Sequence, residues 1–419
     1  MPDTAVARTT DFRAVAGLTG QRLLTWVTPV SRAAPVAFKV PMLRAPTILV
    51  AVVLVLLAVG IVMLASTTSG DRTGKKAVPA KVVKRQLAWL AIAVAAGVGS
   101  AMLDYHRWRQ FAIPLAAATA IALAAVFVPH VGWGTKGARR WVQAGPVRGQ
   151  PSEMAKLASV VMLASWMTYA GARAARLKEG LLKPLGMMGV LLALIMAEPD
   201  FGTTFLIGAT GMAVMFVGGA RIPHLLTAGA AGAVGFVVAI LHDPVRMRRF
   251  FAFIDPDRYP KEAYQLRQSL DAFILGGVSG TGLGGSVQKH GYLPEARTDF
   301  IFSIVGEELG LRITILVLVL FVVFFICGTA ISTRAPDTFG RLLGFGITTT
   351  TALQAAMNIA VVTGCMPTKG LPLPFISAGG SNLVVAMISV GILVNIALHS
   401  ERPVPDDHTR VIKDSVHWA

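Results

Sequence analysis

Asp299 is the carboxylate in this sequence whose position most suggests chemistry. It directly precedes a long apolar run and ends a polar segment that is rich in arginine and proline. A carboxylate held partly away from water has a raised pKa and can take a proton from a hydroxyl group. A structural role is equally open, because Asp and Thr are ordinary N-cap residues and either Thr298 or Asp299 could cap the helix that follows. Asp299 is therefore our candidate general base.

Glu153 and Lys156 form a second candidate group at the start of another apolar run. Pro151 suits the first turn of a helix, and Glu153 suits the positive end of the helix dipole. Because residues three apart share a helix face, Glu153 and Lys156 can form an ion pair. The pair could be a plain interfacial contact with the lysine extended toward water. Alternatively, Lys156 faces an inner cavity and meets Asp299, because both residues begin apolar runs on the same side of the membrane.

Basic residues that could bind phosphate oxygens gather on the side of the membrane that carries Asp299. Arginine matches phosphate geometry well, although each of these residues could simply contact lipid head groups. The segment 130–153 adds Trp133 and Trp141, and basic residues beside aromatic ones are typical of an interfacial anchor. The arginines of this group are Arg85, Arg140, Arg148, Arg246, Arg248 and Arg249.

The stretch "GCMPTKGLPLPFISAGGSN" (364–382) separates the last two apolar runs. Its prolines and glycines break the chain, and irregular backbone at membrane depth is tolerated only where protein or a cavity surrounds it. We expect a re-entrant loop on the outer side, in which Lys369 and Ser377 support the site.

Two further motifs are assigned structural roles. Glu307 lies about 80° around the helix from Asp299 and Glu308 lies opposite, so neither can form a close carboxylate pair with it. We expect at least one of these glutamates to make a polar contact inside the bundle. The stretch "GTGLGG" (280–285) fits G-x-G-x-x-G literally, but it follows no strand and opens no βαβ unit. We therefore expect a flexible turn in a mobile loop, not a dinucleotide site.

The elements that position these residues are membrane helices. The 419-residue chain is 54% hydrophobic and only 15% charged, whereas a soluble protein carries about a quarter charged residues. Apolar runs of roughly 20 residues, each able to cross a ~30 Å hydrocarbon core, recur along it. We predict an all-α polytopic integral membrane protein with about ten transmembrane helices. The predicted spans are 46–66, 85–103, 110–129, 154–172, 185–198, 201–219, 223–242, 300–330, 340–363 and 376–398.

Ten spans place both termini on one side of the membrane and all the long connecting segments on the other. The short loops and the N-terminal segment are basic, which favours cytoplasmic termini. The long segments are basic too, and the net charge of +17 then indicates a polyanionic ligand or anionic lipid on the outer face. We predict a cytoplasmic N-terminal segment (1–45), a membrane domain (46–400) with a large extracytoplasmic loop between spans 7 and 8 (243–299), and a cytoplasmic C-terminal tail (401–419).

The two cysteines, Cys327 and Cys365, cannot form a disulfide framework or a metal site by their spacing. The first 45 residues contain no short apolar core followed by a cleavage site, so we expect the first span to serve as the insertion signal. Neither a Walker A nor an HExxH motif occurs.

Four blocks of the sequence carry a recognisable pattern. They are "GARRWVQAGPVRGQPSEMAKL", "AEPDFGTT", "YQLRQSLDAFILGGVSGTGLGGSVQKHGYLPEARTDFIFSIVGEELG" and "MNIAVVTGCMPTKGLPLPFISAGGSN". Together with the ten-span layout, they cover most of residues 46 to 400. The chain resembles the SEDS family (shape, elongation, division and sporulation), the polytopic glycosyltransferases that include RodA, FtsW and SpoVE. The third and fourth blocks are more similar to FtsW than to RodA.

The resemblance implies a peptidoglycan glycosyltransferase of the cytoplasmic (inner) membrane. Such an enzyme polymerises lipid II, the undecaprenyl-diphosphate-linked disaccharide pentapeptide, on the outer face with inversion at the anomeric carbon. It also implies that Asp299 is the essential catalytic aspartate, and that Glu153 and Lys156 are the family's fourth-span glutamate and lysine. The external arginines that it implies for substrate binding or site support are Arg85, Arg140, Arg148 and Arg249. The similarity to FtsW favours septal wall synthesis in cell division. One departure is Ala378, which stands where the family's last motif, "SYGGS", has an aromatic residue.

The resemblance also implies partners. The family assembles with a class B penicillin-binding protein, a transpeptidase with one membrane span, and with other cell-division membrane proteins; no nucleic acid is implied. A divalent cation, Mg or Mn, could assist at the diphosphate, although the sequence shows no clear metal-ligand cluster.

Two other functions remain open from the sequence. A lipid II flippase or related transporter would also use many spans, a broken element such as "EPDFG" (198–202) and buried charges. Against it, we find no inverted repeat, and only one side of the membrane carries long segments. A non-catalytic scaffold for a transpeptidase is the third possibility, and it predicts that Asp299 is dispensable.

Overall fold

The computed structural model describes residues 45–69, 78–135, 138–144 and 147–400, and these are mostly helical. The predicted cytoplasmic N-terminal segment, apart from residue 45, and the predicted C-terminal tail lie outside the described residues. Each of the ten predicted apolar ranges coincides with one helix. These helices are α2 (Ala45–Ser69), α3 (Val78–Met102), α5 (Ala112–Ala125), α6 (Pro151–Ala170), α7 (Lys183–Ala197), α8 (Phe201–Val217), α9 (Ile222–Leu241), α12 (Ile301–Thr333), α13 (Thr338–Val362) and α14 (Gly380–Ser400).

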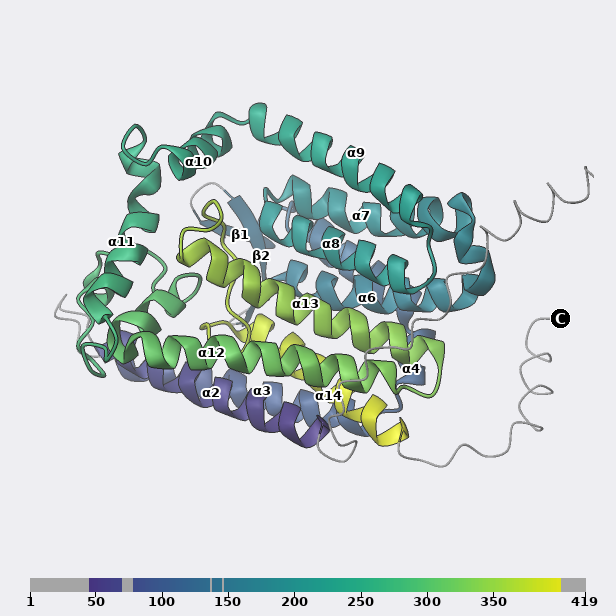
Figure 1. Ribbon diagram of the computed structural model, residues 1–419, viewed down its shortest axis with the longest axis horizontal. Coiled ribbons are helices and arrows are strands. Elements are labelled where there is room, and N and C mark those ends of the chain that lie inside the picture. Colours follow the sequence, from purple (N-terminus) through teal and green to yellow (C-terminus); the bar gives the residue numbers. More distant parts are fainter. Residues whose placement is uncertain (1–44, 70–77, 136–137, 145–146, 401–419) are drawn as a thin grey trace, which may run out of the picture. The chain divides into compact units, whose positions relative to one another are not determined.

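The described residues contain seven helices that are long and apolar enough to cross a membrane, and α5 and α8 are shorter apolar helices. The protein is therefore a multi-pass membrane protein. Figure 1 shows the long helices running side by side, with α10 (Pro244–Ile254) and α11 (Pro260–Gly276) at one end. The remaining helical elements are α4 (His106–Gln110), a 3₁₀ turn (Gly171–Ala175), a π turn (Lys178–Leu182) and a second 3₁₀ turn (Gln288–His290).

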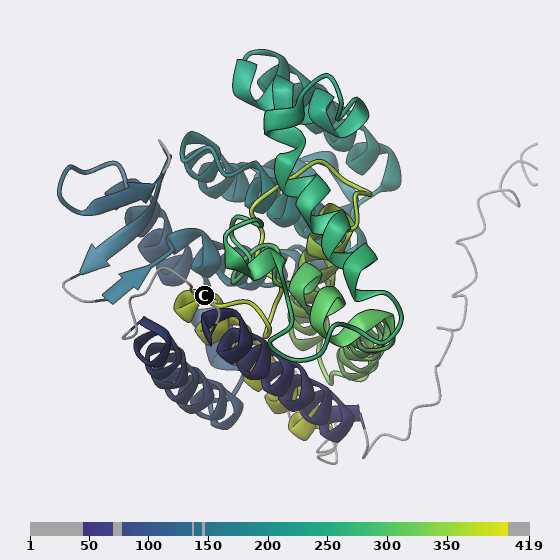
Figure 2. The same ribbon diagram turned by 90° about the vertical axis from the view of Figure 1, so that its left-hand side faces the viewer.

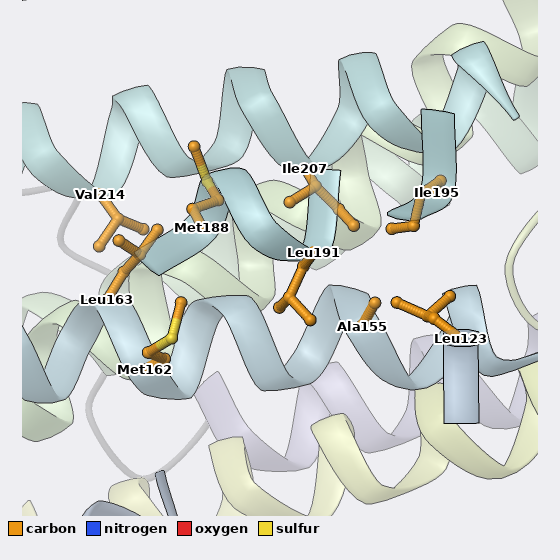
Figure 3. Packing of buried hydrophobic residues seen from close by; sticks show 9 residues of the cluster. All are labelled: Leu123, Ala155, Met162, Leu163, Met188, Leu191, Ile195, Ile207 and Val214. Carbon is orange, nitrogen blue, oxygen red and sulfur yellow. The ribbon is translucent and has the colours of Figure 1, made fainter. Parts of the chain in front are cut away.

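Helix α6, which carries Glu153 and Lys156, is buried along most of its length. Pro151 occupies its first turn and Glu153 lies in that turn, as predicted. Figure 3 shows the apolar cluster that α6 forms with α5, α7 and α8, including Met162, Leu191 and Ile207. Because neighbouring helices cover α6 on several sides, its charged residues face protein and not lipid.

The fold is not purely helical, which corrects the all-α prediction. Strands β1 (Gly132–Thr135), β2 (Ala138–Ala144) and β3 (Val147–Gly149) form an antiparallel sheet in the order β1-β2-β3. Trp133 pairs with Trp141, and the Arg148 guanidinium lies 3.9 Å from the centre of the Trp133 ring. Figure 2 shows this sheet at the edge of the bundle. The elements were predicted from long apolar runs, and these strands are too short and too polar to form one.

Helix α12 is broken at Gly310, so the predicted span 300–330 is not one continuous helix. Gly310 has φ 73° and ψ −178°, outside the helical region. Residues 301–308 before the break are all buried, whereas Leu311, Ile315 and Leu316 beyond it are 44–50% exposed. The chain before Gly310 is therefore enclosed by protein, and the lipid-facing surface begins after it.

Residues 363–379 between α13 and α14 form the irregular loop that the sequence predicts. Leu371, Leu373 and Phe375 are buried. The Phe375 ring lies 5.9 Å from the Phe324 ring of α12, and a Cβ at Gly60 of α2 would lie 2.8 Å from the Phe375 carbonyl oxygen. Since both contacts are with interior positions of long helices, the loop enters the bundle.

Candidate active site

Asp299 lies at the junction of two irregular segments, immediately before Phe300, the N-cap residue of α12. The Phe300 side chain makes no cap hydrogen bond, and a capping role for Thr298 or Asp299 stays a prediction. Asn358 of α13 donates through Nδ2 to the Asp299 carbonyl oxygen (2.7 Å) and to the Leu371 carbonyl oxygen (2.6 Å). One amide thus ties the Asp299 backbone to the re-entrant loop.

Ser377 makes a second tie between the same segments. Its hydroxyl donates to the Thr298 carbonyl oxygen (2.6 Å) and accepts from the Leu373 N–H (2.8 Å). The Ala378 N–H donates to the Arg297 carbonyl oxygen (3.0 Å). Ala378, the residue that departs from the family motif, therefore contributes its backbone here. Three consecutive carbonyl groups, at residues 297–299, are fixed in place.

The Asp299 carboxylate lies against the backbone of Gly370. A Cβ at position 370 would lie 2.9 Å from Asp299 Oδ2, closer than ordinary van der Waals contact. Any side chain at position 370 would therefore displace the Asp299 carboxylate or the loop.

Lys156 and Glu153 form a buried ion pair, 5% and 3% exposed, with 2.7 Å between Nζ and Oε2. Lys156 also donates to Gln354 Oε1 (2.6 Å), and Gln354 Nε2 donates to the Pro372 carbonyl oxygen (2.7 Å). Lys156 is therefore linked to the segment that contacts Asp299 through α13 and the re-entrant loop. Beside the pair is a cavity of about 30 Å³, roughly the room for two waters.

Lys369 has a different environment. Its Nζ lies 5.2 Å from the Phe205 ring centre and 5.1 Å from the Phe236 ring centre. Burial lowers the pKa of this ammonium group, and among the residues that the structure describes no carboxylate pairs with it. A partly desolvated cation over aromatic rings suits an incoming anion.

The "EPDFG" element forms the turn between α7 and α8. Asp200 caps α8 by accepting the Thr203 N–H through Oδ1, and Pro199 has a strained φ of 33°. Arg140 donates from Nε to the Glu198 carbonyl oxygen (3.1 Å) and from Nη2 to the Pro199 carbonyl oxygen (2.6 Å). Both Glu198 carboxylate oxygens are buried without a hydrogen-bond partner in the described structure. Burial, aided by Asp200, raises the pKa of Glu198 to about 8.

The predicted arginines divide into two kinds. Arg140 and Arg148 already have protein partners, because Arg148 stacks on Trp133 and its Nε donates to Gln143 Oε1 (3.1 Å). Arg85 in α3 and Arg249 in α10 are exposed. Their assignment to substrate phosphates stays a prediction.

Glu307 and Glu308 make structural contacts, as predicted, and both are buried. They hold the loop 277–290, which packs on α12. Within it, Gly280 and Gly282 have φ of 80° and 89°, so "GTGLGG" is a turn. Contrary to the expectation of a mobile loop, a Cβ at Gly310 would meet the Ser279 carbonyl carbon at 2.7 Å. These glycines permit close backbone packing.

No group of three or more His, Cys, Asp or Glu side chains in the described residues is placed to hold a metal ion. The divalent cation considered from the sequence stays a prediction.

Sequence reasoning missed Gln354 and Asn358, which connect the site. Both are amides inside a predicted span, and a polar residue at membrane depth is itself a functional signal. Together the described residues form a carboxylate held by its backbone, a neutralised buried lysine and a second lysine available to an anion. This set can activate a hydroxyl and stabilise a departing phosphate.

Comparison with known sequences places this chain among cell-cycle proteins. The sequence model of the FtsW/RodA/SpoVE family, described as "Cell cycle protein", matches residues 46–402. The "Probable peptidoglycan glycosyltransferase FtsW" of Trichlorobacter lovleyi is 37% identical over 84% of this chain and 92% of its own length. The "Stage V sporulation protein E" of Bacillus subtilis is 37% identical over 84% of this chain and 97% of its own length.

Solved structures are similar as well. One described as "Structural coordination of polymerization and crosslinking by a peptidoglycan synthase complex" matches with a TM-score of 0.70 and 26% identity, covering 85% of this chain and 98% of that chain. The Rod shape determining protein RodA of Thermus thermophilus matches with a TM-score of 0.63 and 25% identity, covering 85% of this chain and 97% of that chain.

Proposed function

The chain belongs to the FtsW/RodA/SpoVE family of cell cycle proteins, and from this membership we propose that it is a peptidoglycan glycosyltransferase. It polymerises lipid II into glycan strands at the outer face of the cytoplasmic membrane. The observation that carries the proposal is the arrangement at Asp299, whose backbone is held by Asn358 and Ser377 while its carboxylate lies against Gly370. The names of the FtsW relatives favour septal wall synthesis.

The proposed topology has ten spans, cytoplasmic termini and an extracytoplasmic site. It is supported by the ten helices that coincide with the ten predicted apolar ranges. If every one of them crosses the membrane, the sheet, the loop 243–299 and the re-entrant loop all lie on one side. That side carries Asp299 and the predicted phosphate-binding arginines.

In the proposed reaction Asp299 acts as general base. The 4-hydroxyl oxygen of the acceptor sugar forms a bond to the anomeric carbon of the donor, and its proton passes to the Asp299 carboxylate. The bond from that carbon to the diphosphate oxygen breaks, and undecaprenyl diphosphate leaves with the electron pair. The ties at residues 297–299 fix the carboxylate before the substrates arrive, which lowers the entropic part of the barrier.

Lys369 stabilises the departing diphosphate. Negative charge grows on the leaving group in the transition state, and a fixed cation near it lowers the barrier. Lys369 suits this role because its described neighbours are aromatic rings instead of a carboxylate. Arg85 and Arg249, both exposed, are further candidates for diphosphate contacts.

Lys156 and Glu153 position the re-entrant loop and do not contact the substrate. Their charges neutralise each other, and the bond from Lys156 to Gln354 leads to the re-entrant loop. We assign them to positioning the loop residues that face Asp299.

The proposed partner is a transpeptidase, a class B penicillin-binding protein, in the company of other cell-division membrane proteins. Support comes from the similarity to a chain of a complex whose description couples polymerization to crosslinking.

The test uses the full chain, purified and reconstituted into vesicles that contain lipid II, with and without its cognate transpeptidase. We expect glycan polymer in at least one of these conditions. Transbilayer movement of lipid II without polymer would support a flippase instead. Neither polymer nor movement, together with binding of the transpeptidase, would support a scaffold.

A further inference from the structure

We propose that the buried Lys289–Glu308 pair positions Asp299 by fastening the segment that leads to it onto the end of helix α2. The effect on catalysis rests on the proposed function, whereas the fastening itself does not. Lys289 and Glu308 would act through the backbone, as positioning residues that do not touch the substrate.

The pair lies in the interior of the protein. Lys289 Nζ is 2.9 Å from Glu308 Oε1, and the two side chains are 2% and 0% exposed. Ser66 of α2 donates to both Glu308 oxygens (2.8 and 2.6 Å), and Lys289 Nζ lies 3.2 Å from Ser66 Oγ. A buried ion pair seldom adds stability over an apolar pair of similar volume. Its value here is the specific arrangement of three segments.

Glu307, the residue before Glu308, binds the turn that carries Lys289 (residues 286–289). Its Oε1 accepts the Val287 N–H (2.7 Å) and the Gln288 N–H (3.3 Å), and its Oε2 accepts the Ser286 hydroxyl. The two glutamates therefore hold residues 286–289 by both backbone and side chain.

The break at Gly310 lets the backbone of α12 bind the preceding loop as well. In an unbroken helix the Leu311 N–H would bond to the Glu307 carbonyl oxygen. Here the Leu311 N–H donates to the Gly277 carbonyl oxygen (3.0 Å). The freed carbonyl groups of Glu307 and Glu308 accept the N–H groups of Thr281 (2.9 Å) and Gly282 (3.0 Å). The loop thus replaces the missing helical bonds.

A second contact with α2 holds the other end of the segment. Arg297 Nη2 donates to the Thr67 carbonyl oxygen (3.1 Å). Ser66 and Thr67, adjacent in α2, therefore anchor both Lys289 and Arg297, and Leu293 between them is 3% exposed. Asp299 follows two residues after the second anchor, so a shift at Lys289 would be passed along a segment with little slack.

The test compares the wild-type chain with Lys289→Met/Glu308→Leu, which removes both charges and leaves neither buried alone. We expect a Tm within a few degrees of wild type. Polymerisation kcat should fall on the order of 10- to 100-fold with KM for lipid II unchanged, because the base is misplaced while binding is kept. Amide hydrogen exchange of residues 287–300 should be faster on the order of tenfold. The single variant Lys289→Arg, which keeps the charge and the Glu308 partner, should retain most of the wild-type kcat.

The control is Lys183→Met/Glu179→Leu, which removes a more exposed ion pair (42% and 16%) of similar length, 2.8 Å, between the π turn and α7. It should change neither kcat nor exchange at 287–300. Unchanged kcat in the Lys289→Met/Glu308→Leu variant would overturn the proposal, as would a fall in kcat that only follows loss of folded protein. If the wild type makes no polymer, the proposed function fails, and unchanged exchange at 287–300 would still reject the fastening.

Discussion

Lys369 lies in the re-entrant loop and Lys156 is linked to that loop through Gln354, yet their surroundings differ. Lys156 is 5% exposed, pairs with Glu153 and donates to Gln354. Lys369 is only half-buried and lies over two phenylalanine rings. A cation that is already neutralised inside the protein cannot contribute a full charge to a ligand, whereas a cation without a carboxylate partner can. The contrast separates a lysine that builds the site from one that meets the substrate.

The largest effect within this comparison should follow Lys156→Met. Removing one partner leaves the Glu153 carboxylate buried and uncompensated, which costs about 3–5 kcal/mol of folding free energy. We expect a clear drop in Tm and loss of polymerisation. Lys156→Met/Glu153→Leu should recover Tm but not kcat, because the bond to Gln354 is still missing. Thermal unfolding and polymer yield from lipid II measure the two effects, and full activity in the double variant would remove Lys156 from the site.

Lys369→Gln should have a large effect on catalysis with little effect on stability. Loss of a cation at the leaving group is expected to lower kcat on the order of 10²-fold, while Tm stays near that of wild type. Rates should be measured at saturating lipid II. Equal losses of Tm in Lys369→Gln and Lys156→Met would erase the distinction between the two lysines.

Gly370→Ala tests how closely the re-entrant loop packs against the Asp299 carboxylate. The added methyl would lie 2.9 Å from Asp299 Oδ2 and must push the carboxylate aside. We expect kcat to fall about tenfold, because displacement of a catalytic group by a fraction of an ångström is costly. Gly186→Ala is the control, because nothing lies within 4 Å of the added Cβ. Wild-type kcat in Gly370→Ala would show that the added methyl does not displace the carboxylate from its catalytic position.

The helices could be predicted from the sequence because each is a long apolar run, and Asp299, Glu153 and Lys156 could be identified because charge is rare beside such runs. The break at Gly310 could not, since one glycine within "GEELGLRI" leaves the apolar pattern intact. The sheet could not be predicted either, because its strands are too short and too polar to stand out as apolar runs. Gln354 and Asn358 were visible as polar residues, but which loop carbonyl groups they bind depends on tertiary packing.

Glu198→Gln, away from both lysines, should change stability in a pH-dependent way, and its effect should be smallest near pH 5. The pKa of Glu198 is raised from its ordinary value of 4.5 to about 8. Between these values the folded chain keeps a proton that the unfolded chain releases, so stability falls as pH rises from about 4.5 to about 8. The variant cannot ionise. Its Tm should therefore depend less on pH in this range and should exceed that of wild type at pH above 8, with similar Tm near pH 5. Parallel Tm–pH curves for the two proteins would contradict this.

The most direct measurement is the rate of glycan formation from lipid II by Asp299→Asn beside wild type, in the same vesicles and with the same transpeptidase. Asparagine keeps the size of the side chain and the backbone ties to Asn358 and Ser377 but removes the base. We predict an unchanged Tm and no detectable polymer above background. Polymer at the wild-type rate from a folded Asp299→Asn variant would show that Asp299 is not the base.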